Sequence, residues 1–384
     1  MRGSVAIAGV GLAGCGEAPG WTEMEIAAAA AKNALGDAGL SARDVDGIVV
    51  ASTNIFMSGL ALAEHLGVHP KFTESTMVGG SSFVGHLIPA ALALNAGLCD
   101  TILVAYGSSQ RTGVGRAEAG KYKMALDPQP FEHPYKPFNP PTSYALAAAR
   151  HMHQYGTTRA QLAEIAVAAR QWAQLNPEAF AREPLTVEDV LGSRMVSDPL
   201  TVRDCCLVTD GGGAYVLTRA ERAKDFPKPP AYLLGVGAAH WHRQISSMPD
   251  LTVTAATESG QRAFEMAGLG PQDVDVVELY DAFTINTLLF LEDLGFCGKG
   301  EGGAFVSGGR IAPGGELPVN TNGGGLSCVH PGMYGIFLLV EAVRQLRGEG
   351  GARQVKDAAV ALAHGNGGVL SSQITALLGT KDTL

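Results

Sequence analysis

The chain is poor in the features that mark disulfide-stabilised, membrane-spanning and nucleic-acid-binding proteins. It has only six cysteines in 384 residues and no CxxC pair, so we expect neither a disulfide framework nor a metal site, and we expect a reducing cytoplasm. No apolar run approaches the ~18–20 residues that a membrane helix needs. The net charge is −9 and no basic block occurs, which argues against nucleic-acid binding.

What the chain does contain is typical of an α/β enzyme. Hydrophobic residues make up 46% of it, charged residues only 17%, and there are 50 glycines. This length buries a large core and suffices for two domains or for one duplicated unit. The composition excludes a disordered or fibrous chain.

An internal duplication is visible in the sequence. Residues 34–46 read ALGDAGLSARDVD and residues 263–275 read AFEMAGLGPQDVD. Upstream, Gly9-Val10-Gly11 recurs as Gly235-Val236-Gly237. The first apolar run is therefore a strand that both halves share. This interpretation replaces the dinucleotide fingerprint GxGxxG that residues 9–14 also match.

The duplicated segments divide the chain into residues 1–230 and 231–384. In each half we expect the order strand, helix, strand, helix, strand. Helices are predicted at about residues 83–97 and 333–347, and short apolar runs predict buried parallel strands at 48–50, 101–106, 274–277 and 358–363. We expect two sheets with helices on and between them.

A long insertion, about residues 110–195, separates the two halves. It contains PQPFEHPYKPFNPP at residues 128–141, and proline at this density excludes helix and central strand. The segment is either a surface loop or a lid over a pocket, since Phe131, Tyr135 and Phe138 give it apolar faces. Helices are predicted after it, at residues 144–155 and 160–174.

Two stretches of the second half have the pattern of a reaction site. Tyr280-Asp281-Ala282-Phe283 stands where an apolar run meets a helical pattern over residues 284–294, and Asn320–Gly325 (NTNGGG) precedes His330-Pro331-Gly332. A strand that turns sharply into a helix places the side chains of the turn at the helix N-terminus. Unpaired backbone N–H groups at that end can hold an oxyanion.

These motifs carry a family resemblance. YDAF before a helix, NTNGGG-x4-HPG and the closing turn His364-Gly365-Asn366-Gly367-Gly368 resemble the thiolase superfamily. The resemblance is to its sterol-carrier-protein-type branch, and within that branch to the aldolase-like, lipid-transfer-protein-named members. It implies a thiolase fold, in which duplicated βαβαβ halves form a five-layer α-β-α-β-α sandwich with an inserted loop domain.

The resemblance also implies ligands and partners. Substrates of such enzymes are coenzyme A thioesters, so coenzyme A is expected as part of the substrate and no tightly bound cofactor is expected. A homodimer is implied, together with a small partner protein of the zinc-ribbon/OB-fold kind. The aromatic insertion indicates a bulky acyl group, such as a steroid.

The sequence departs from the thiolase pattern at both catalytic cysteines. The nucleophilic cysteine of the family falls near Gly80, yet no cysteine lies between Cys15 and Cys99. The His-Asp-Cys-Phe motif of sterol-carrier-type thiolases is YDAF here, so Ala282 replaces its cysteine. A retro-aldol cleavage of a β-hydroxyacyl-CoA needs no nucleophile, only a base and donors that stabilise an enolate.

Roles for the candidate residues follow from this match. Tyr280 and His330 are expected as acid/base and oxyanion groups, with Tyr334 as a further tyrosine beside the HPG turn and His364 assisting. The remaining candidates are expected to bind substrate: Gly79, Gly80, Ser81, Ser82, Asp281, Asn322 and Gly324.

Two alternatives remain open. Ser81 or Ser82 is a candidate nucleophile for acyl transfer if His330 or His364 activates it, although a serine before a helix is commonly a cap. A protein of the same fold can also be a catalytically silent acyl-CoA- or lipid-binding subunit.

Overall fold

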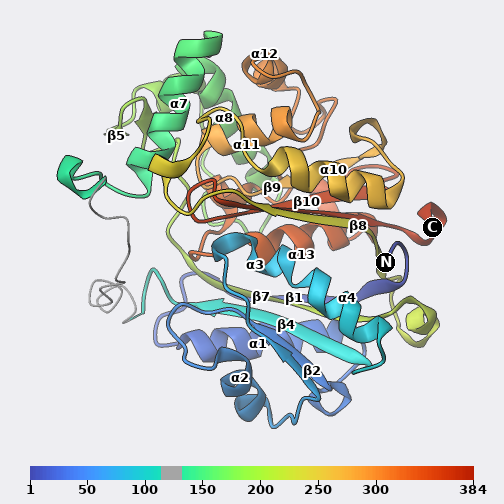
Figure 1. Ribbon diagram of the computed structural model, residues 1–384. Coiled ribbons are helices and arrows are strands. Elements are labelled where there is room, and N and C mark those ends of the chain that lie inside the picture. The colour runs from blue at the N-terminus through green and yellow to red at the C-terminus, as the bar shows by residue number, and fades with distance from the viewer. Residues whose placement is uncertain (114–131) are drawn as a thin grey trace.

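Two β-sheets alternate with three layers of helices (Figure 1). The computed structural model describes residues 1–113 and 132–384. Helices α1 and α2 cover the outer face of the first sheet, α3, α4 and α13 lie between the sheets, and α10 and α11 cover the outer face of the second sheet (Figure 1). This is the five-layer arrangement that the family resemblance implies.

The first half builds a sheet with the strand order β3-β2-β4-β7-β1. Its elements are β1 (Val5–Gly16), α1 (Glu23–Asp37), β2 (Gly47–Val50), α2 (Ser58–Leu66), β3 (Phe72–Glu74), α3 (Ser82–Gly85), α4 (Leu87–Asn95), β4 (Thr101–Ser108) and β7 (Asp210–Arg219). The single helix predicted at residues 83–97 is divided into α3 and α4. Pro89 has no N–H to donate to the carbonyl of Gly85, so the helical ladder is interrupted there.

The second half repeats the arrangement in the order β8-β11-β10-β9. Its elements are β8 (Ala231–His240), α10 (Ala256–Ala267), β9 (Val276–Leu279), α11 (Thr284–Asp293), α12 (Gly302–Val306), a π-helical turn (Gly324–Cys328), α13 (Gly335–Leu346), β10 (Val360–Gly367) and β11 (Ser372–Gly379). β1 pairs antiparallel with β8 at Ala6–Tyr232 and Ile7–Ala231, so the sheets of the two halves are hydrogen-bonded edge to edge into one series of nine strands.

The strands are less uniformly parallel than predicted. β2 is parallel to β3 and β4, and β9 is parallel to β10. In contrast, β7 is antiparallel to β4 and β1, and β11 is antiparallel to β10 and β8. The sequence analysis missed β11, because an antiparallel return needs only a short turn and leaves no crossover helix as a signal.

The structure explains why glycine recurs in the duplicated strands. A Cβ atom at Gly9 would lie 2.3 Å from the carbonyl oxygen of Ala34 in α1, and a Cβ at Gly235 would lie 2.1 Å from that of Ala263 in α10. Ala34 and Ala263 are also equivalent residues of the repeat. In each half, a strand glycine packs against a helix alanine, and this brings the helix into backbone contact with the strand.

A second repeated pair joins neighbouring strands. Asp46 accepts hydrogen bonds from the backbone N–H groups of Asp100 and Thr101, both at 2.9 Å. Its counterpart Asp275 accepts from Ala359 and Val360 at 2.8 and 2.9 Å. Each aspartate precedes one parallel strand and caps the start of the next, so the repeated DVD sequence fixes strand pairing in both halves.

The insertion forms mainly helices that pack on the second half. It contains α7 (Pro141–Tyr155), α8 (Arg159–Gln174), α9 (Val187–Leu191) and a small hairpin of β5 (Met195–Ser197) and β6 (Leu200–Thr201). Buried His151 of α7 contacts both carboxylate oxygens of Glu292 in α11, at 3.1 and 3.2 Å. Lys299 adds an ion pair to the same carboxylate at 3.0 Å.

The aromatic lid remains a prediction. Phe131 lies outside the described residues, and the side chains of Tyr135 and Phe138 are 86% and 66% exposed. Short helical segments complete the described part of the chain, at Ala42–Asp44, Gly79–Ser81, His133–Tyr135, Ala220–Asp225, Ile245–Ser247, Pro271–Asp273, Ser307–Gly309, Gly351–Arg353 and Lys381–Thr383. No helix in the described ranges is both long and apolar enough to cross a bilayer.

Candidate active site

Glycines bring the separate motifs into backbone contact between the two sheets. A Cβ at Gly335, the first residue of α13, would lie 2.2 Å from the carbonyl oxygen of Gly80. A Cβ at Gly79 would lie 2.7 Å from the backbone nitrogen of Gly368, and Gly79 has a φ of +73°. The turn before α3, the start of α13 and the end of β10 therefore meet at one place.

Gly80 lies directly against the ring of Tyr280. A Cβ at Gly80 would lie 2.2 Å from Cε2 and 2.4 Å from the hydroxyl oxygen of Tyr280, distances that no real side chain tolerates. The family resemblance places the nucleophilic cysteine near this position. In this arrangement the phenol of Tyr280 fills the space that such a side chain would need.

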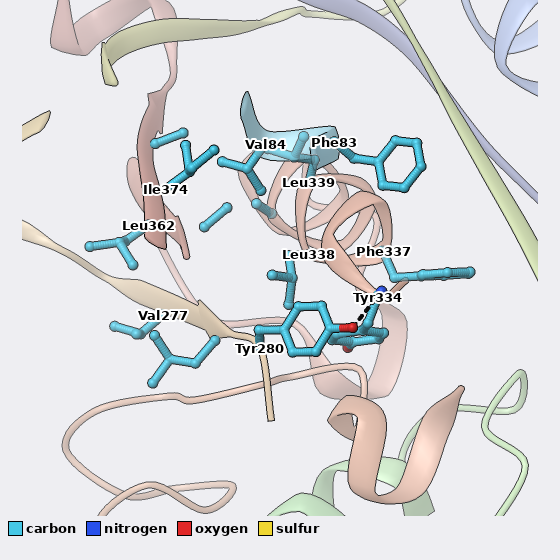
Figure 2. Close-up of a cluster of buried hydrophobic side chains, with 14 of the residues drawn as sticks. Phe83, Val84, Val277, Tyr280, Tyr334, Phe337, Leu338, Leu339, Leu362 and Ile374 are labelled. Atoms are coloured by element: carbon cyan, nitrogen blue, oxygen red, sulfur yellow. Dashed lines mark hydrogen bonds between the residues drawn. The ribbon is translucent and has the colours of Figure 1, made fainter. Parts of the chain in front are cut away.

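The Tyr280 hydroxyl is held by the turn that follows His330. It donates a hydrogen bond to the carbonyl of Gly332 at 3.1 Å and accepts one from the N–H of Tyr334 at 3.2 Å. Figure 2 shows Tyr280 reaching from the end of β9 toward the start of α13, with the Tyr334 N–H directed at its oxygen. Figure 2 also shows the apolar side chains, among them Leu338 and Phe337, that surround the pair.

Three aromatic rings form the centre of the candidate site. The ring centroids of Tyr280 and His330 are 5.6 Å apart, those of Tyr280 and Tyr334 are 5.7 Å apart, and both pairs meet edge to face. The rings of His330 and Tyr334 are nearly parallel at 6.0 Å. The structure thus brings together three of the four residues to which the sequence analysis gave catalytic roles.

Burial sets the protonation states of these groups. It lowers the pKa of His330 to about 4, so the imidazole is neutral at pH 7. It raises the pKa of Tyr280 and of Tyr334 well above the ordinary phenol value, so both are hydrogen-bond donors and neither is a standing base. The Nε2 atom of His330 is buried without a hydrogen-bond partner among the described residues, which leaves it available to a ligand.

The NTNGGG segment is organised by Asp281 and Asn322. The buried carboxylate of Asp281 accepts the N–H of Gly325 at 2.6 Å and of Leu326 at 3.3 Å. Burial raises the pKa of Asp281 to about 7. Asn322 Oδ1 accepts the Tyr334 hydroxyl at 3.0 Å and the N–H of Gly324 at 2.7 Å. Asp281 and Asn322 therefore fix the conformation of the NTNGGG segment, and Asn322 orients Tyr334.

Gly324 itself packs against this carboxylate. A Cβ there would lie 2.0 Å from the Oδ2 atom of Asp281, and the φ of Gly324 is +66°. Glycine is required at this position by both space and conformation.

His364 is placed apart from the other candidates. The sequence analysis expected it in a turn, but residues 364–367 belong to β10, which pairs with β11 from His364–Thr375 to Gly367–Ser372. Its ring nitrogens contact Thr375 Oγ1 at 2.8 Å and Gln373 Oε1 at 2.9 Å. Side chains alternate along a strand, so Gly365 faces Ser81 while the His364 ring packs on Phe290 of α11.

His364 still meets the site through its backbone, because its carbonyl accepts the Tyr280 N–H at 3.0 Å. The ring is fully buried and the pKa of His364 is lowered to about 3 by desolvation. These contacts fit a residue that positions Tyr280.

The hydroxyls of both candidate serines are already hydrogen-bonded, that of Ser82 within the turn and that of Ser81 to the turn and to Ser372. Ser81 Oγ donates to the carbonyl of Val78 at 3.0 Å and contacts Ser372 Oγ at 2.8 Å. Ser82 Oγ accepts the Val78 N–H at 2.9 Å. The histidine connected to Ser81, through Ser372, is His240. Neither of the bases that the sequence analysis considered contacts these hydroxyls.

Several neighbours of Tyr280 were missed by the sequence analysis. Tyr106 donates to the carbonyl of Pro331 at 2.5 Å and accepts the N–H of Met333 at 3.2 Å, so it clamps the same turn. Tyr144 and Cys206 also lie close enough that their charged forms would raise the Tyr280 pKa. All three belong to the first half or the insertion, and no local motif marks Tyr106 or Tyr144.

Cys206 is not an activated thiol. Burial is the main cause that raises its pKa, so the nucleophilic thiolate form is disfavoured. Within the described residues no group of three or more histidine, cysteine, aspartate or glutamate side chains is placed to hold a metal ion.

Comparisons with known proteins agree on one family. A family model described as thiolase C-terminal domain-like matches residues 237–380. A steroid side-chain-cleaving aldolase of Thermomonospora curvata is 35% identical over 91% of both chains. The 17-hydroxy-3-oxo-4-pregnene-20-carboxyl-CoA lyase of Mycobacterium tuberculosis is 34% identical, covering 91% of this chain and 92% of the lyase. An acetyl-CoA acetyltransferase of Methanothermobacter thermautotrophicus is 35% identical over 95% of this chain and 96% of its own length.

Among solved structures, the Ltp2-ChsH2(DUF35) aldolase superposes with a TM-score of 0.89 at 33% identity, covering 99% of this chain and 98% of that chain. The similarity therefore extends over both halves and the insertion. The chain belongs to the thiolase superfamily and is an enzyme of its lyase or acyltransferase kind.

Proposed function

We propose that the protein cleaves the carbon–carbon bond of a bulky β-hydroxyacyl-CoA by a retro-aldol reaction that uses no cysteine nucleophile. The single observation that carries this proposal is the contact between Gly80 and Tyr280, since the phenol occupies the space that a nucleophilic side chain at residue 80 would need. The similarity to an aldolase and to a hydroxyacyl-CoA lyase supports the same reaction class.

The proposed reaction assigns one proton path and one oxyanion site. The substrate β-hydroxyl gives its proton to Nε2 of His330, the Cα–Cβ bond breaks, and its electron pair forms the thioester enolate. The hydroxyl of Tyr280 and backbone N–H groups of the Gly79–Ser82 turn hold the enolate oxygen. His330 returns the proton to the α-carbon, so the products are a ketone or aldehyde and a shortened acyl-CoA.

The protonation states favour this division of roles. A neutral imidazole is a competent base, whereas a phenol with a raised pKa is a better donor than base. Substrate binding would have to replace the hydrogen bond from Tyr280 to the Gly332 carbonyl. Tyr334 and His364 would act by positioning, Tyr334 through its backbone N–H and His364 through its carbonyl.

Tyr280→Phe tests this proposal. The variant keeps the ring and its packing, and we expect kcat to fall by ~10²–10³, the loss seen when one oxyanion donor is removed. Tyr232→Phe is the matched control, because Tyr232 is also a buried tyrosine and lies at the start of β8, where it pairs with Ala6 and Gly379. Equal turnover in the wild type and Tyr280→Phe would contradict the assignment.

Acyl transfer through Ser81 or Ser82 is the alternative within enzymes. Both hydroxyls are buried and hydrogen-bonded, Ser82 to Val78 and Ser81 to Val78 and Ser372, which disfavours either as a nucleophile. A Ser81→Ala/Ser82→Ala double variant that keeps full activity would exclude this mechanism. A silent acyl-CoA- or lipid-binding subunit would bind ligand but show no turnover that depends on Tyr280.

The substrate and assembly are part of the same proposal. Coenzyme A enters as part of the substrate and no cofactor is tightly bound. The acyl group is steroid-like, and a small zinc-ribbon/OB-fold protein binds alongside in the cytoplasm. The similar Ltp2-ChsH2(DUF35) aldolase is, by its name, an assembly of two components, which supports such a partner here.

A homodimer is proposed as the core of this assembly. β3 is the edge strand of its sheet in the described part of the chain. The neighbouring Phe56, Met57, Leu60 and Met77 are 88%, 54%, 45% and 43% exposed. An unpaired edge beside exposed apolar side chains favours association, and light scattering of the purified protein measures it. The division into halves at residues 230 and 231 remains a proposal as well.

A further inference from the structure

Strands β10 and β11 carry a row of polar side chains inside the protein. On β10 the row consists of His364 and Asn366, and their partners on β11 are Thr375 and Gln373. The exposed fraction of each of these side chains is 2% or less. Aliphatic side chains would fill the same space without the cost of burying polar groups, so packing alone does not explain the row.

A single series of hydrogen bonds connects this row to the insertion. Gln373 Oε1 contacts His364 Nε2 at 2.9 Å, and Gln373 Nε2 donates to Asn366 Oδ1 at 2.8 Å. Asn366 Nδ2 donates to the hydroxyl of Tyr144 in α7 at 3.1 Å, and this hydroxyl donates to the carbonyl of Gly368 at 2.9 Å. The series therefore begins in the second sheet, passes through the insertion and ends at the residue after β10.

The atoms involved fix the direction of the series. The amide oxygen of Gln373 can only accept a hydrogen bond, so Nε2 of His364 carries the ring proton. Nδ1 of the neutral ring then accepts, and its partner at 2.8 Å is the hydroxyl of Thr375. From Thr375 onward each group donates to the next. The loss of one link therefore leaves a buried donor or acceptor unpaired.

The series holds two parts of the candidate site. The backbone carbonyl of His364 accepts the Tyr280 N–H at 3.0 Å. At the other end, Gly368 packs so closely on the turn before α3 that a Cβ at Gly79 would lie 2.7 Å from the nitrogen of Gly368. That turn carries Gly80 against the Tyr280 ring. In the proposed function, the same turn also supplies the N–H groups that hold the enolate oxygen.

Tyr144 adds a contact with the YDAF motif. Its ring stacks on that of Phe283, with the centroids 4.3 Å apart, while its hydroxyl holds the carbonyl of Gly368. Burial raises the pKa of Tyr144 to about 12, so the hydroxyl keeps its proton and remains a donor at pH 7. One side chain of the insertion thus connects the residue after β10 with the motif that carries Tyr280.

We propose that Tyr144, Asn366 and Gln373 are positioning residues for the retro-aldol reaction. They hold Tyr280 and the turn before α3 at the separation that one enolate oxygen requires. The inference rests on the proposed function, because only there do the phenol and the backbone N–H groups of the turn bind the same oxygen atom. The insertion therefore contributes to catalysis and not only to the walls of the site.

Two variants break the series at different points. Tyr144→Phe removes the hydroxyl and keeps the ring, and Thr375→Val removes, at nearly equal size, the hydroxyl that donates to His364. Because the two changes lie in different elements, a folding defect in one variant leaves the other as the test. Tyr155→Phe is the matched control, since Tyr155 lies in the same helix as Tyr144 and its hydroxyl accepts from Gln154, outside the series.

The carbon-13 NMR signal of the Tyr280 phenol reports on its surroundings without turnover. The label is placed on the tyrosine carbon that bears the hydroxyl, and the signal is identified as the one missing from Tyr280→Phe. We expect Tyr144→Phe and Thr375→Val to shift this signal. They should lower kcat for a β-hydroxyacyl-CoA by ~10-fold and leave KM within about twofold, because misplaced reacting groups slow the chemical step. Tyr155→Phe should match the wild type in all three measurements.

An unchanged Tyr280 signal in both variants overturns the inference, and so does a rise in KM without a fall in kcat. The two proposals fail separately. If the wild type cleaves the hydroxy substrate and the variants keep both kcat and the signal, the positioning role fails and the aldol function stands. If the signal shifts in both variants but the wild type cleaves no hydroxyacyl-CoA, the function fails and the link between the series and Tyr280 stands.

Discussion

At the residue scale, the proposal of a reaction without a nucleophile depends on the contact between Gly80 and the ring of Tyr280. The sequence shows that cysteine is missing at both expected positions, and this predicts a reaction without an acyl-enzyme. It does not show that a tyrosine from the other half fills the vacated space. That fact depends on the distance between two residues 200 positions apart, which no local pattern encodes.

Gly80→Ala tests this contact. The added methyl group would overlap the Tyr280 ring, so we expect the phenol to be displaced, turnover to fall at least tenfold, and stability to drop by ~1–3 kcal/mol, as in other overpacked cores. Gly36→Ala is the control, because a Cβ at Gly36 of α1 meets nothing within 4 Å and alanine favours a helix.

Kinetics and urea unfolding of the two alanine variants provide the measurement. Full activity in Gly80→Ala would mean that the ring position is not required for catalysis.

The histidines give the fold a pH dependence with a definite sign. His364 has a folded pKa of about 3 against ~6.5 for an unfolded histidine. Between these values the unfolded chain binds more protons, so stability is present above pH 6.5 and is lost as the pH falls toward 3. For this one residue the loss between pH 7.5 and pH 5 is about 2 kcal/mol.

His364→Gln should remove about this much of the acid-induced loss, measured as the difference in unfolding free energy between pH 7.5 and pH 5. His153→Gln, at an exposed position of α7, should leave the difference unchanged. An identical pH profile in the wild type and His364→Gln would show that the buried ring contributes no such linkage.

At the element scale, much of the fold can be predicted from the sequence, because the same glycine, alanine and aspartate contacts are needed in both halves and therefore recur in the sequence. The helix–strand order, the start of β4 at Thr101 and the helices α7, α8 and α11 are close to their predicted positions. The misplaced segment is residues 364–367. Its glycines indicate a turn, yet they serve a strand, since a Cβ at Gly367 would lie 1.7 Å from the carbonyl oxygen of Val78. Close approach to a neighbouring turn cannot be told from backbone flexibility in one sequence.

The repeated glycines lead to a paired prediction. Gly9→Ala and Gly235→Ala should each push a helix away from its strand, because their Cβ atoms would meet the carbonyls of Ala34 and Ala263. We expect both to lower the unfolding free energy by ~1–3 kcal/mol. Thermal and urea unfolding provide the measurement, with Gly36→Ala as the control. A loss of stability in only one of the two variants would mean that the two halves are not packed equivalently.

At the scale of the whole molecule, the site exists only because the two halves and the insertion meet. Tyr280, His330 and Tyr334 come from the second half, Gly80 and Tyr106 from the first, and Tyr144 from the insertion. The motif residues could be predicted from the sequence, since each stands in a recognisable pattern. The residues that surround these motifs, such as Tyr106 and Tyr144, could not be predicted, since only tertiary packing brings them to the site.

The most direct test of the account is a product assay with purified protein, with and without a candidate partner. β-Hydroxyacyl-CoA and β-ketoacyl-CoA substrates are each supplied with and without free coenzyme A, and products are identified by mass spectrometry. If the protein is an aldolase, the hydroxy substrate yields one ketone or aldehyde per shortened acyl-CoA, independently of free coenzyme A. Cleavage of the keto substrate alone, and only with free coenzyme A present, would contradict it and would require a nucleophile.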